Sequence, residues 1–182
     1  MTQQKEDYVI LVDETDNETG VLEKLEAHRR AALHRAISVF ICNTKGEWLL
    51  QRRAFGKYHS NGLWTNTCCS HPYPGETSLE AAHRRLEEEM GIKTALKEIF
   101  WFTYKAPLDN ELTEHELDHV FVGFTDEHPK INTREVDEWK YMNYTELKTD
   151  IKNHPEKYTV WFKMIFEHVN SHLQNLKSNE ND

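Results

Sequence analysis

Residues 66–92, NTCCSHPYPGETSLEAAHRRLEEEMGI, constrain the fold more than any other part of the chain. The first half of this stretch predicts a short strand. Cys69 and His71 share one face of that strand with Thr67, because residues two apart in an extended chain point to the same side. Cys68 points to the opposite side. A turn with two prolines and a glycine follows, and it ends the strand.

The second half of the stretch predicts an amphipathic helix. Thr77 and Glu80 have the spacing of a capping box, which begins a helix, and Gly91 ends it. Apolar residues at helical spacing form one stripe, made of Leu79, Ala82, Leu86 and Met90. Residues four apart on one side are placed to pair, namely Arg84 with Glu88 and Arg85 with Glu89. A strand, a loop and a helix rich in carboxylates favour a site for a divalent metal and a phosphate group.

The bulk composition predicts a single soluble domain over residues 1–182, with its core at about 9–166. A net charge of -9 argues against binding to nucleic acid or to an anionic membrane. The expected partner is therefore a small molecule, and the chain is expected to be a monomer or a homodimer. No apolar run is long enough to cross a bilayer, and the N-terminus lacks the pattern of a signal peptide. The cysteines, Cys42, Cys68 and Cys69, are odd in number, which favours a reducing cytoplasm over a disulfide framework.

Hydrophobic patterning predicts a mixture of strands and helices. The predicted strands are 8–12, 36–42, 48–50, 99–104, 116–125 and 136–144. The predicted helices after the central stretch are 147–153 and an amphipathic one at 159–176, followed by a frayed tail at 177–182. Residues 53–62 form a basic loop and residues 110–114 a polar one. Strands with interleaved helices place the chain in the mixed α/β (α+β) class.

Five residues have the chemistry of a metal site: His28, His34, His71, Glu114 and Glu116. The imidazoles are predicted at strand or loop positions. The two carboxylates are two residues apart, so an extended backbone aims both to one side. Three neutral nitrogens and two anionic oxygens suit manganese, zinc or magnesium. The chain has 11 histidines, however, so each one taken singly is more simply a surface residue.

The central stretch resembles the Nudix box, GX5EX7REUXEEXGU, in which U is a bulky apolar residue. The helix half matches at Arg84, Leu86, Glu88, Glu89, Gly91 and Ile92, and Glu76 fills the earlier acidic position. Ser70 and Arg85 depart from the pattern, because they stand where Gly and Glu belong. Both departures are typical of the type 1 isopentenyl-diphosphate isomerases. The chain resembles this family over about residues 9–166, also in the segments EKLEAHRRAALHRAISVF, TNTCCSHP and EHELD.

The resemblance implies an α/β/α sandwich around a mixed β-sheet. It also implies interconversion of isopentenyl and dimethylallyl diphosphate in isoprenoid biosynthesis, by protonation of the alkene and deprotonation of a carbocation-like intermediate. The five His and Glu residues would hold one divalent ion, Mn²⁺, Mg²⁺ or Zn²⁺, and Glu89 would share a Mg²⁺ ion with the substrate diphosphate. Because a diphosphate needs several cationic donors, the resemblance assigns its binding to Lys24, Arg53, Lys57 and Arg85.

The resemblance further assigns the acid–base chemistry to Cys69 and Glu116. It implies that the Tyr104 hydroxyl lies beside Glu116 and that the Trp161 ring lies over the substrate. Without the resemblance, a cysteine in a β-rich segment is interpreted as a small buried hydrophobic residue. This interpretation is kept for Cys42 and Cys68. The two aromatic residues would likewise be ordinary core. His115 and His119 are predicted to be bystanders on the opposite face of their strand.

Two other classes of function stay open. A Nudix-type diphosphate hydrolase would need a carboxylate where Arg85 stands, and it would leave Cys69 without a role. Release of phosphate from nucleoside diphosphates would identify it. A non-catalytic metal-binding module would take up metal and convert no prenyl diphosphate.

Overall fold

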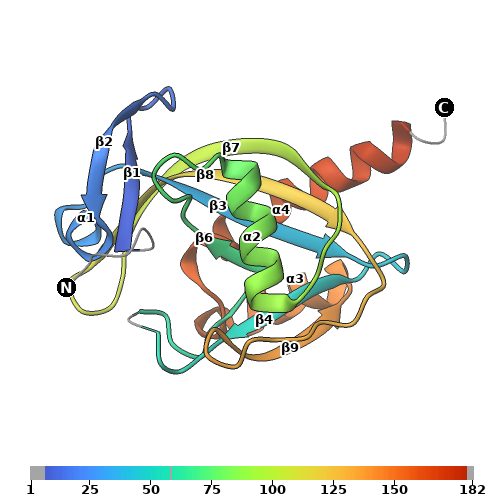
Figure 1. Ribbon diagram of the computed structural model, residues 1–182. Helices are drawn as coiled ribbons and strands as arrows, with labels where there is room; N and C mark the ends of the chain where they lie inside the picture. The colour runs from blue at the N-terminus through green and yellow to red at the C-terminus, as the bar shows by residue number, and fades with distance from the viewer. Residues whose placement is uncertain (1–6, 58, 180–182) are drawn as a thin grey trace.

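The computed structural model describes residues 7–57 and 59–179, whose strands form one nine-stranded sheet (Figure 1). The strands are β1 (Tyr8–Val12), β2 (Glu18–Glu23), β3 (His34–Cys42), β4 (Trp48–Arg53), β5 (Trp64–Thr65), β6 (Cys68–Ser70), β7 (Leu96–Pro107), β8 (Thr113–Phe124) and β9 (Val136–Met142). The helices are α1 (Lys24–Arg30), α2 (Ser78–Met90), α3 (Tyr144–Asn153) and α4 (Val160–Asn179), with a 3-10 turn at Pro155–Lys157. Strand β3 pairs in parallel with β8 and antiparallel with β4, so the sheet is mixed.

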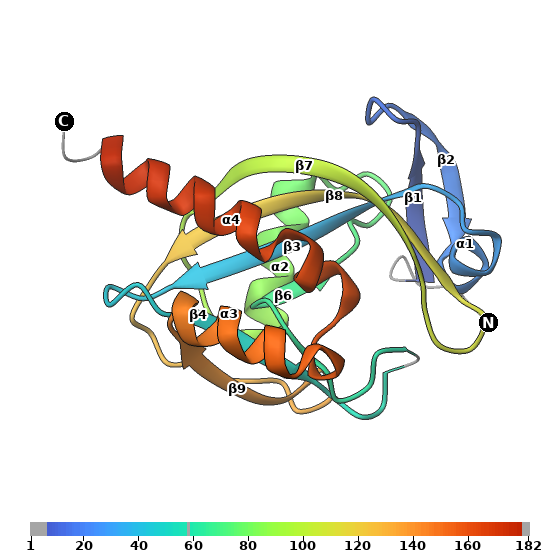
Figure 2. The ribbon, with the colours of Figure 1, turned by 180° about the vertical axis from the view of Figure 1, so that it is seen from behind.

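Helices cover both faces of this sheet because β3 carries apolar side chains on both sides. Ile37 and Val39 pack with α2 on one face, whereas Phe40 packs with α3 and α4 on the other. Figure 1 shows α2 in front of the sheet, and Figure 2, which views the molecule from the opposite side, shows α3 and α4 in front of it. All residues of β3 are buried, as is typical of a strand enclosed between two helical layers. The predicted α/β/α sandwich is confirmed.

Helix α2 begins and ends where the sequence predicts. The Thr77 hydroxyl accepts from the Glu80 N–H at 3.2 Å, and the Glu80 carboxylate accepts from the Thr77 N–H at 2.9 Å. Gly91 ends the helix with φ 64°, a left-handed conformation that favours glycine. The apolar stripe differs in one place, because Leu79 is 44% exposed and Ala81 occupies the buried side of the first turn.

Helix α1 corrects one prediction about the metal candidates. His28 lies on this helix, not at a strand or loop position. Glu23 begins the helix, since its carboxylate accepts hydrogen bonds from the N–H groups of Leu25 and Glu26 at 3.1 and 2.8 Å. The helix has seven residues and is too short to show a hydrophobic period.

Several other boundaries differ from the predictions, and two of them concern residues discussed above. Strand β8 begins at Thr113, so Glu114 belongs to a strand and not to the preceding loop. Helix α4 continues to Asn179, so the first half of the predicted tail at 177–182 is helical. Residues 180–182 lie outside the described residues. Within the described part of the chain, no helix has the length and apolar composition needed to cross a membrane.

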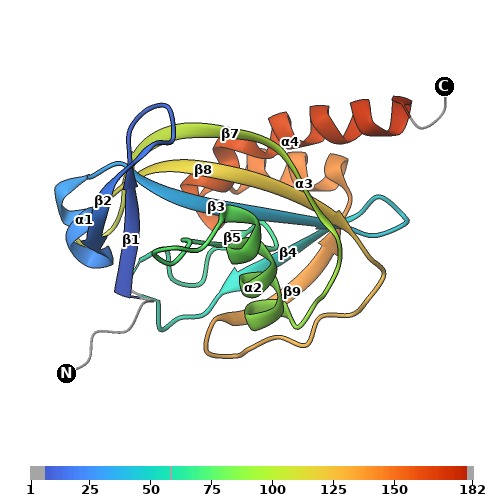
Figure 3. The same ribbon diagram turned by 45° about the horizontal axis from the view of Figure 1, so that its top comes forward.

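The amino ends of β3 and β8 meet at one end of the sheet, where α1 packs against β8. Figure 3 shows α1, β1 and β2 at this same end. His34 is the first residue of β3, and its register partner in β8 is Glu116. Strand pairing alone therefore fixes an imidazole beside a carboxylate.

Candidate active site

Three imidazoles and two carboxylates meet at this end of the sheet. They belong to His28 on α1, His34 on β3, His71 just after β6, and Glu114 and Glu116 on β8. The ring centroids of His28 and His34 are 4.9 Å apart, and those of His34 and His71 are 5.0 Å apart. His71 Nε2 lies 2.8 Å from Glu116 Oε1, and His28 Nε2 lies 3.4 Å from Glu114 Oε2. The structure thus groups the ligand atoms of four predicted ligands, whereas Glu114 groups with His28 and with His59, which was not predicted.

The backbone orients two of these rings for metal binding. His28 Nδ1 donates to the Lys24 carbonyl at 2.6 Å, and His34 Nδ1 donates to the Ala32 carbonyl at 2.8 Å. Because a carbonyl only accepts, the proton of each neutral ring lies on Nδ1 and the lone pair lies on Nε2. Ligand atoms within 4.8 Å of one another come from His28, His34, His71 and Glu116. This donor set fits a divalent ion with mixed nitrogen and oxygen ligands.

The two buried carboxylates differ in their affinity for protons. Burial, and then the charge of Glu116, raise the pKa of Glu114 well above its usual range. Burial would also raise the pKa of Glu116, but hydrogen bonds and charges from His34 and His71 outweigh it and hold that pKa below its ordinary value. A cation between the two would favour the ionised form of both.

Cys68 and Cys69 face opposite sides of the sheet, as alternation along β6 predicts. Cys68 is fully buried in the core beneath α2. Cys69 packs against the core on the α4 side and lines a cavity there. Burial raises the pKa of the Cys69 thiol to about 12, although the Arg53 guanidinium opposes this. The thiol therefore holds its proton at neutral pH.

Two aromatic side chains lie beside the carboxylate and the thiol. The Tyr104 hydroxyl donates to Glu116 Oε2 at 2.7 Å, and burial, with the charge of Glu116, raises the pKa of Tyr104 well above its usual value. Trp161, on α4, is buried and lines the cavity of Cys69. The guanidinium carbon of Arg53 lies 5.4 Å from the centre of the Trp161 ring. That ring already contacts a cation, so its face suits positive charge.

The cavity of Cys69, Glu116 and Trp161 has a volume of about 60 Å³ and adjoins another of about 180 Å³. The basic residues that line both are Lys24, Lys57 and Arg85, while Arg53 lines the smaller one. Burial, followed by the charges of the three other cations, lowers the pKa of Lys24 to about 8. Among the described residues, the buried Arg53 Nε has no hydrogen-bond partner. This concentration of positive charge is typical of a pocket for an anion.

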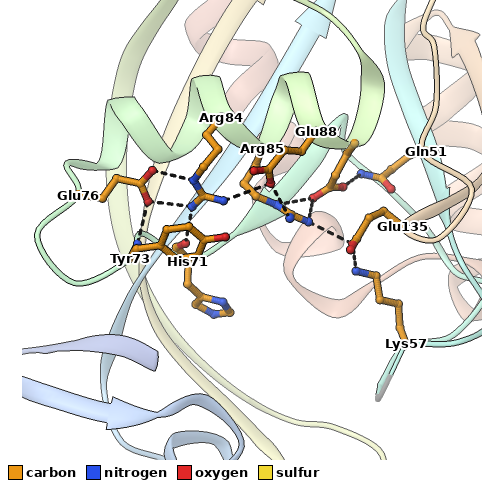
Figure 4. A network of polar contacts seen from close by, with 10 residues as sticks. Gln51, Lys57, His71, Tyr73, Glu76, Arg84, Arg85, Glu88 and Glu135 are labelled. Atoms are coloured by element: carbon orange, nitrogen blue, oxygen red, sulfur yellow. Dashed lines mark hydrogen bonds and ion pairs between the residues drawn. The ribbon is translucent and has the colours of Figure 1, made fainter. Parts of the chain in front are cut away.

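Carboxylates balance two of these cations, as Figure 4 shows. Arg85 donates to Glu89 Oε1 at 2.6 Å and to Glu135 Oε2 at 3.1 Å, and Lys57 pairs with the same Glu135 oxygen. Burial would lower the pKa of Arg85, but Glu89 and Glu135 outweigh it and raise that pKa. Gln51 Nε2 donates to the other oxygen of Glu89 at 2.7 Å. An anion that binds Arg85 and Lys57 would thus compete with Glu135.

Arg84 has the structural role that its helix spacing predicts. It donates to Glu76 Oε1 at 2.7 Å and to Glu88 Oε2 at 3.3 Å, and its guanidinium carbon lies 3.6 Å from the ring centre of Tyr73. Glu76 also accepts from the Tyr73 N–H at 2.8 Å, so the pair fixes the turn before α2 (Figure 4). Arg84 lines neither cavity.

His115 and His119 lie away from the imidazole cluster, on the other face of β8, as predicted. His115 Nδ1 contacts the Ala31 carbonyl at 2.8 Å. His119 lies between two carboxylates, with Nε2 3.0 Å from Asp16 Oδ2 and Nδ1 2.8 Å from Glu98 Oε1.

Sequence reasoning missed three polar residues near the site. His59, from the basic loop, is buried with Nε2 3.6 Å from Glu114 Oε1. Glu135 is the counterion of Arg85 and Lys57. Asp118 is buried and accepts a hydrogen bond from the Ser38 hydroxyl at 2.7 Å. Of these three residues, only Asp118 could have been found from the sequence. It follows Glu116 by two positions, so it shares a face of β8 with Glu114 and Glu116.

Comparisons with known proteins agree with this geometry. A profile of the NUDIX domain matches residues 32–162. The chain is 52% identical over 172 residues to the isopentenyl-diphosphate Delta-isomerase of Pectobacterium atrosepticum, covering 94% of this chain and 96% of that one. It is 52% identical over 164 residues to isopentenyl-diphosphate Delta-isomerase 2 of Aromatoleum aromaticum, covering 90% and 87% of the two chains.

Solved structures share the fold at lower identity. DR0079 from Deinococcus radiodurans superposes with a TM-score of 0.68 at 18% identity, covering 80% of this chain and 89% of that one. The MutT protein of Methanosarcina mazei gives a TM-score of 0.63 at 23% identity, covering 76% and 94%. These two show the fold alone, whereas the relatives of higher identity show the family. The chain belongs to the isopentenyl-diphosphate Delta-isomerase family and carries its NUDIX domain.

Proposed function

We propose that this chain interconverts isopentenyl diphosphate and dimethylallyl diphosphate. The observation that carries the proposal is that Cys69 and Glu116, from β6 and β8, line one small cavity together with Trp161. Moving a double bond by one carbon requires a proton to be added at one carbon and removed from another. An acid and a base on different strands can reach the two faces of a flat five-carbon unit.

We infer the order of the two proton transfers from the directions of the pKa shifts. The Cys69 thiol holds its proton, while Glu116 is ionised. The thiol proton adds to C4 of isopentenyl diphosphate, which breaks the C3=C4 π bond and leaves positive charge at C3. Glu116 then takes a proton from C2, and the electrons of that C–H bond form the C2=C3 double bond. The Cys69 thiolate and protonated Glu116 return to the resting state by proton exchange with solvent, or they start the reverse reaction.

The surroundings of the cavity suit a short-lived cation. Trp161 offers an aromatic face to the charge at C3, which is attractive by about 0.5–2 kcal/mol depending on desolvation. Tyr104 holds one oxygen of Glu116 and fills the space beside it. Burial of both aromatic side chains excludes water, which would otherwise trap the cation as an alcohol.

The remaining assignments follow the chemistry of the donor atoms. His28, His34, His71, Glu114 and Glu116 would hold one divalent ion, Mn²⁺, Mg²⁺ or Zn²⁺. When bound, that ion would offset the charge of both carboxylates and fix their positions. The substrate diphosphate and its Mg²⁺ would bind at Glu89 and at the cationic residues Lys24, Arg53, Lys57 and Arg85. We further place this reaction in the cytoplasm and assign it to one domain, residues 1–182.

Product analysis separates the isomerase from a Nudix hydrolase. Incubation with isopentenyl diphosphate in deuterated water should yield dimethylallyl diphosphate carrying deuterium, because the added proton comes ultimately from solvent. A chelator should stop the conversion, and added Mn²⁺ or Mg²⁺ should restore it. Release of inorganic phosphate from nucleoside diphosphates, without an allylic product, would replace this proposal by the hydrolase.

Arg85 provides a sharper test of the anion pocket. Arg85→Gln removes a cation that lines both cavities, so we expect the KM for isopentenyl diphosphate to rise by about 10- to 100-fold, the loss of one or two charge-assisted hydrogen bonds. Arg85→Glu restores the Nudix pattern and should weaken binding further, with little hydrolase activity gained. Arg84→Gln is the matched control, because Arg84 lines neither cavity. An unchanged KM in Arg85→Gln would remove Arg85 from the anion site.

A further inference from the structure

His59 lies at the edge of the imidazole and carboxylate cluster, although the sequence pattern did not single it out. It is 5% exposed, and it follows β4 in the loop that precedes β5. Its Nε2 lies 3.6 Å from Glu114 Oε1, which is ion-pair range and a few tenths of an ångström longer than a hydrogen bond. Its ring centroid lies 6.0 Å from that of His28. A small shift of Glu114 would bring the two groups into direct contact.

The two oxygens of Glu114 face different histidines. Oε2 lies 3.4 Å from His28 Nε2, a proposed metal ligand, whereas Oε1 lies 3.6 Å from His59 Nε2. A carboxylate that binds a metal through one oxygen is commonly held by a hydrogen bond to the other. The ligand atoms of His28, His59 and Glu114 lie within 4.8 Å of one another, and His59 faces the Glu114 oxygen that His28 does not. His59 can therefore serve as such an outer partner.

The contacts of the loop are compatible with the His59 tautomer that this role requires. His59 Nδ1 lies 3.1 Å from the Ser60 hydroxyl, which can donate to it and leave the ring proton on Nε2. The Ser60 N–H donates to Asp109 Oδ2 at 3.3 Å, and Arg53 Nη2 donates to the His59 carbonyl at 3.4 Å.

We propose that His59 positions Glu114 for metal binding, as an outer partner that donates from Nε2 to Glu114 Oε1 while the other carboxylate oxygen faces the ion. The inference rests on the metal site of the proposed function. It adds a residue from the loop that also contributes Lys57 to the cavity. The edge-on contact of His59 with Trp161, at 5.9 Å between ring centroids, also connects the metal site with the wall of the substrate cavity.

Three substitutions at one position separate hydrogen bonding from packing. His59→Ala removes both the ring and the donor, His59→Phe keeps a ring against Trp161 without a donor, and His59→Gln keeps an N–H donor. Mn²⁺ affinity is measured for the whole chain at neutral pH by competition with a metal-sensitive dye. We expect affinity to fall about 10- to 100-fold in the Ala and Phe variants, the usual cost of losing an outer partner, and to be largely retained in the Gln variant.

A matched control and a spectroscopic count complete the test. His115→Ala, next to Glu114 in sequence but on the other face of β8, should bind Mn²⁺ like the wild type. Pulsed EPR of the Mn²⁺-loaded protein should count three bound nitrogens in the wild type and in His59→Gln. Thermal melting of the metal-free variants shows that each one folds.

Each alternative gives a different pattern. Retained affinity in His59→Phe with a loss in His59→Gln would mean packing and would overturn the proposal. A fourth nitrogen in the wild type would make His59 a direct ligand and would also overturn it. Equal affinity in all variants would exclude His59 and leave the proposed function untouched. A wild type that binds none of Mn²⁺, Mg²⁺ and Zn²⁺ would overturn both proposals. The expected affinities in a chain without isomerase activity would leave the role of His59 in place and remove the isomerase.

Discussion

Cys69→Ala should abolish isomerisation, whereas Cys68→Ala should leave most of it. The two cysteines are neighbours in β6 but face opposite sides of the sheet. Cys69 lines the cavity with a protonated thiol, so its loss removes the acid, and general acid–base groups contribute about 10²- to 10⁴-fold to the rate. Cys68 lies in the core beneath α2, where a truncation costs on the order of 1 kcal/mol of stability and no chemistry.

The measurement is kcat for isopentenyl diphosphate in both variants, with thermal melting of each. Cys69→Ala should keep its melting temperature and its KM, because the diphosphate is held by other residues, and lose kcat. Cys68→Ala should show the reverse, a lower melting temperature with kcat retained. Equal losses of kcat in the two variants would contradict either the role of Cys69 or its orientation.

The alternation of side chains along strands accounts for much of what the sequence predicted correctly. Cys69 and Cys68 lie on opposite faces of β6, because successive side chains of an extended backbone alternate between the two faces. For the same reason Glu114 and Glu116 lie on the opposite face of β8 from His115. The capping box and Gly91 likewise placed α2 within a residue of its observed ends. These features depend only on neighbouring residues, which is why one sequence suffices to predict them.

The residues that were missed depend on contacts between distant segments. His59 reaches Glu114 only because the loop after β4 folds over the amino end of β8. Glu135 meets Arg85 across 50 positions of sequence, and no local pattern announces that pair. His28 was placed at a strand or loop position because α1 is short and is marked mainly by the Glu23 cap. The combination of His28 with the other ligands came from the resemblance, not from spacing.

Protons and metal should compete for the imidazole and carboxylate cluster. Burial lowers the pKa of His71 to about 3, so its ring is neutral and ready to coordinate well below neutral pH. Glu114, whose pKa is raised, is the carboxylate that takes up a proton first as the pH falls in the ion-free site. The metal-free state therefore binds more protons than the loaded state, and metal affinity must fall as the pH falls. Metal and activity should be lost together in the acidic range.

His71→Ala should shift this release to higher pH. The variant loses one of three nitrogen ligands, so its affinity at neutral pH is lower and fewer competing protons suffice to empty the site. His119→Ala should release metal at the same pH as the wild type, because His119 contacts Asp16 and Glu98 on the other face of β8. Metal content after dialysis over a series of pH values decides between them. Release at one common pH in all three proteins would show that His71 is no ligand, and a wild type that is active and metal-free at neutral pH would contradict the metal site itself.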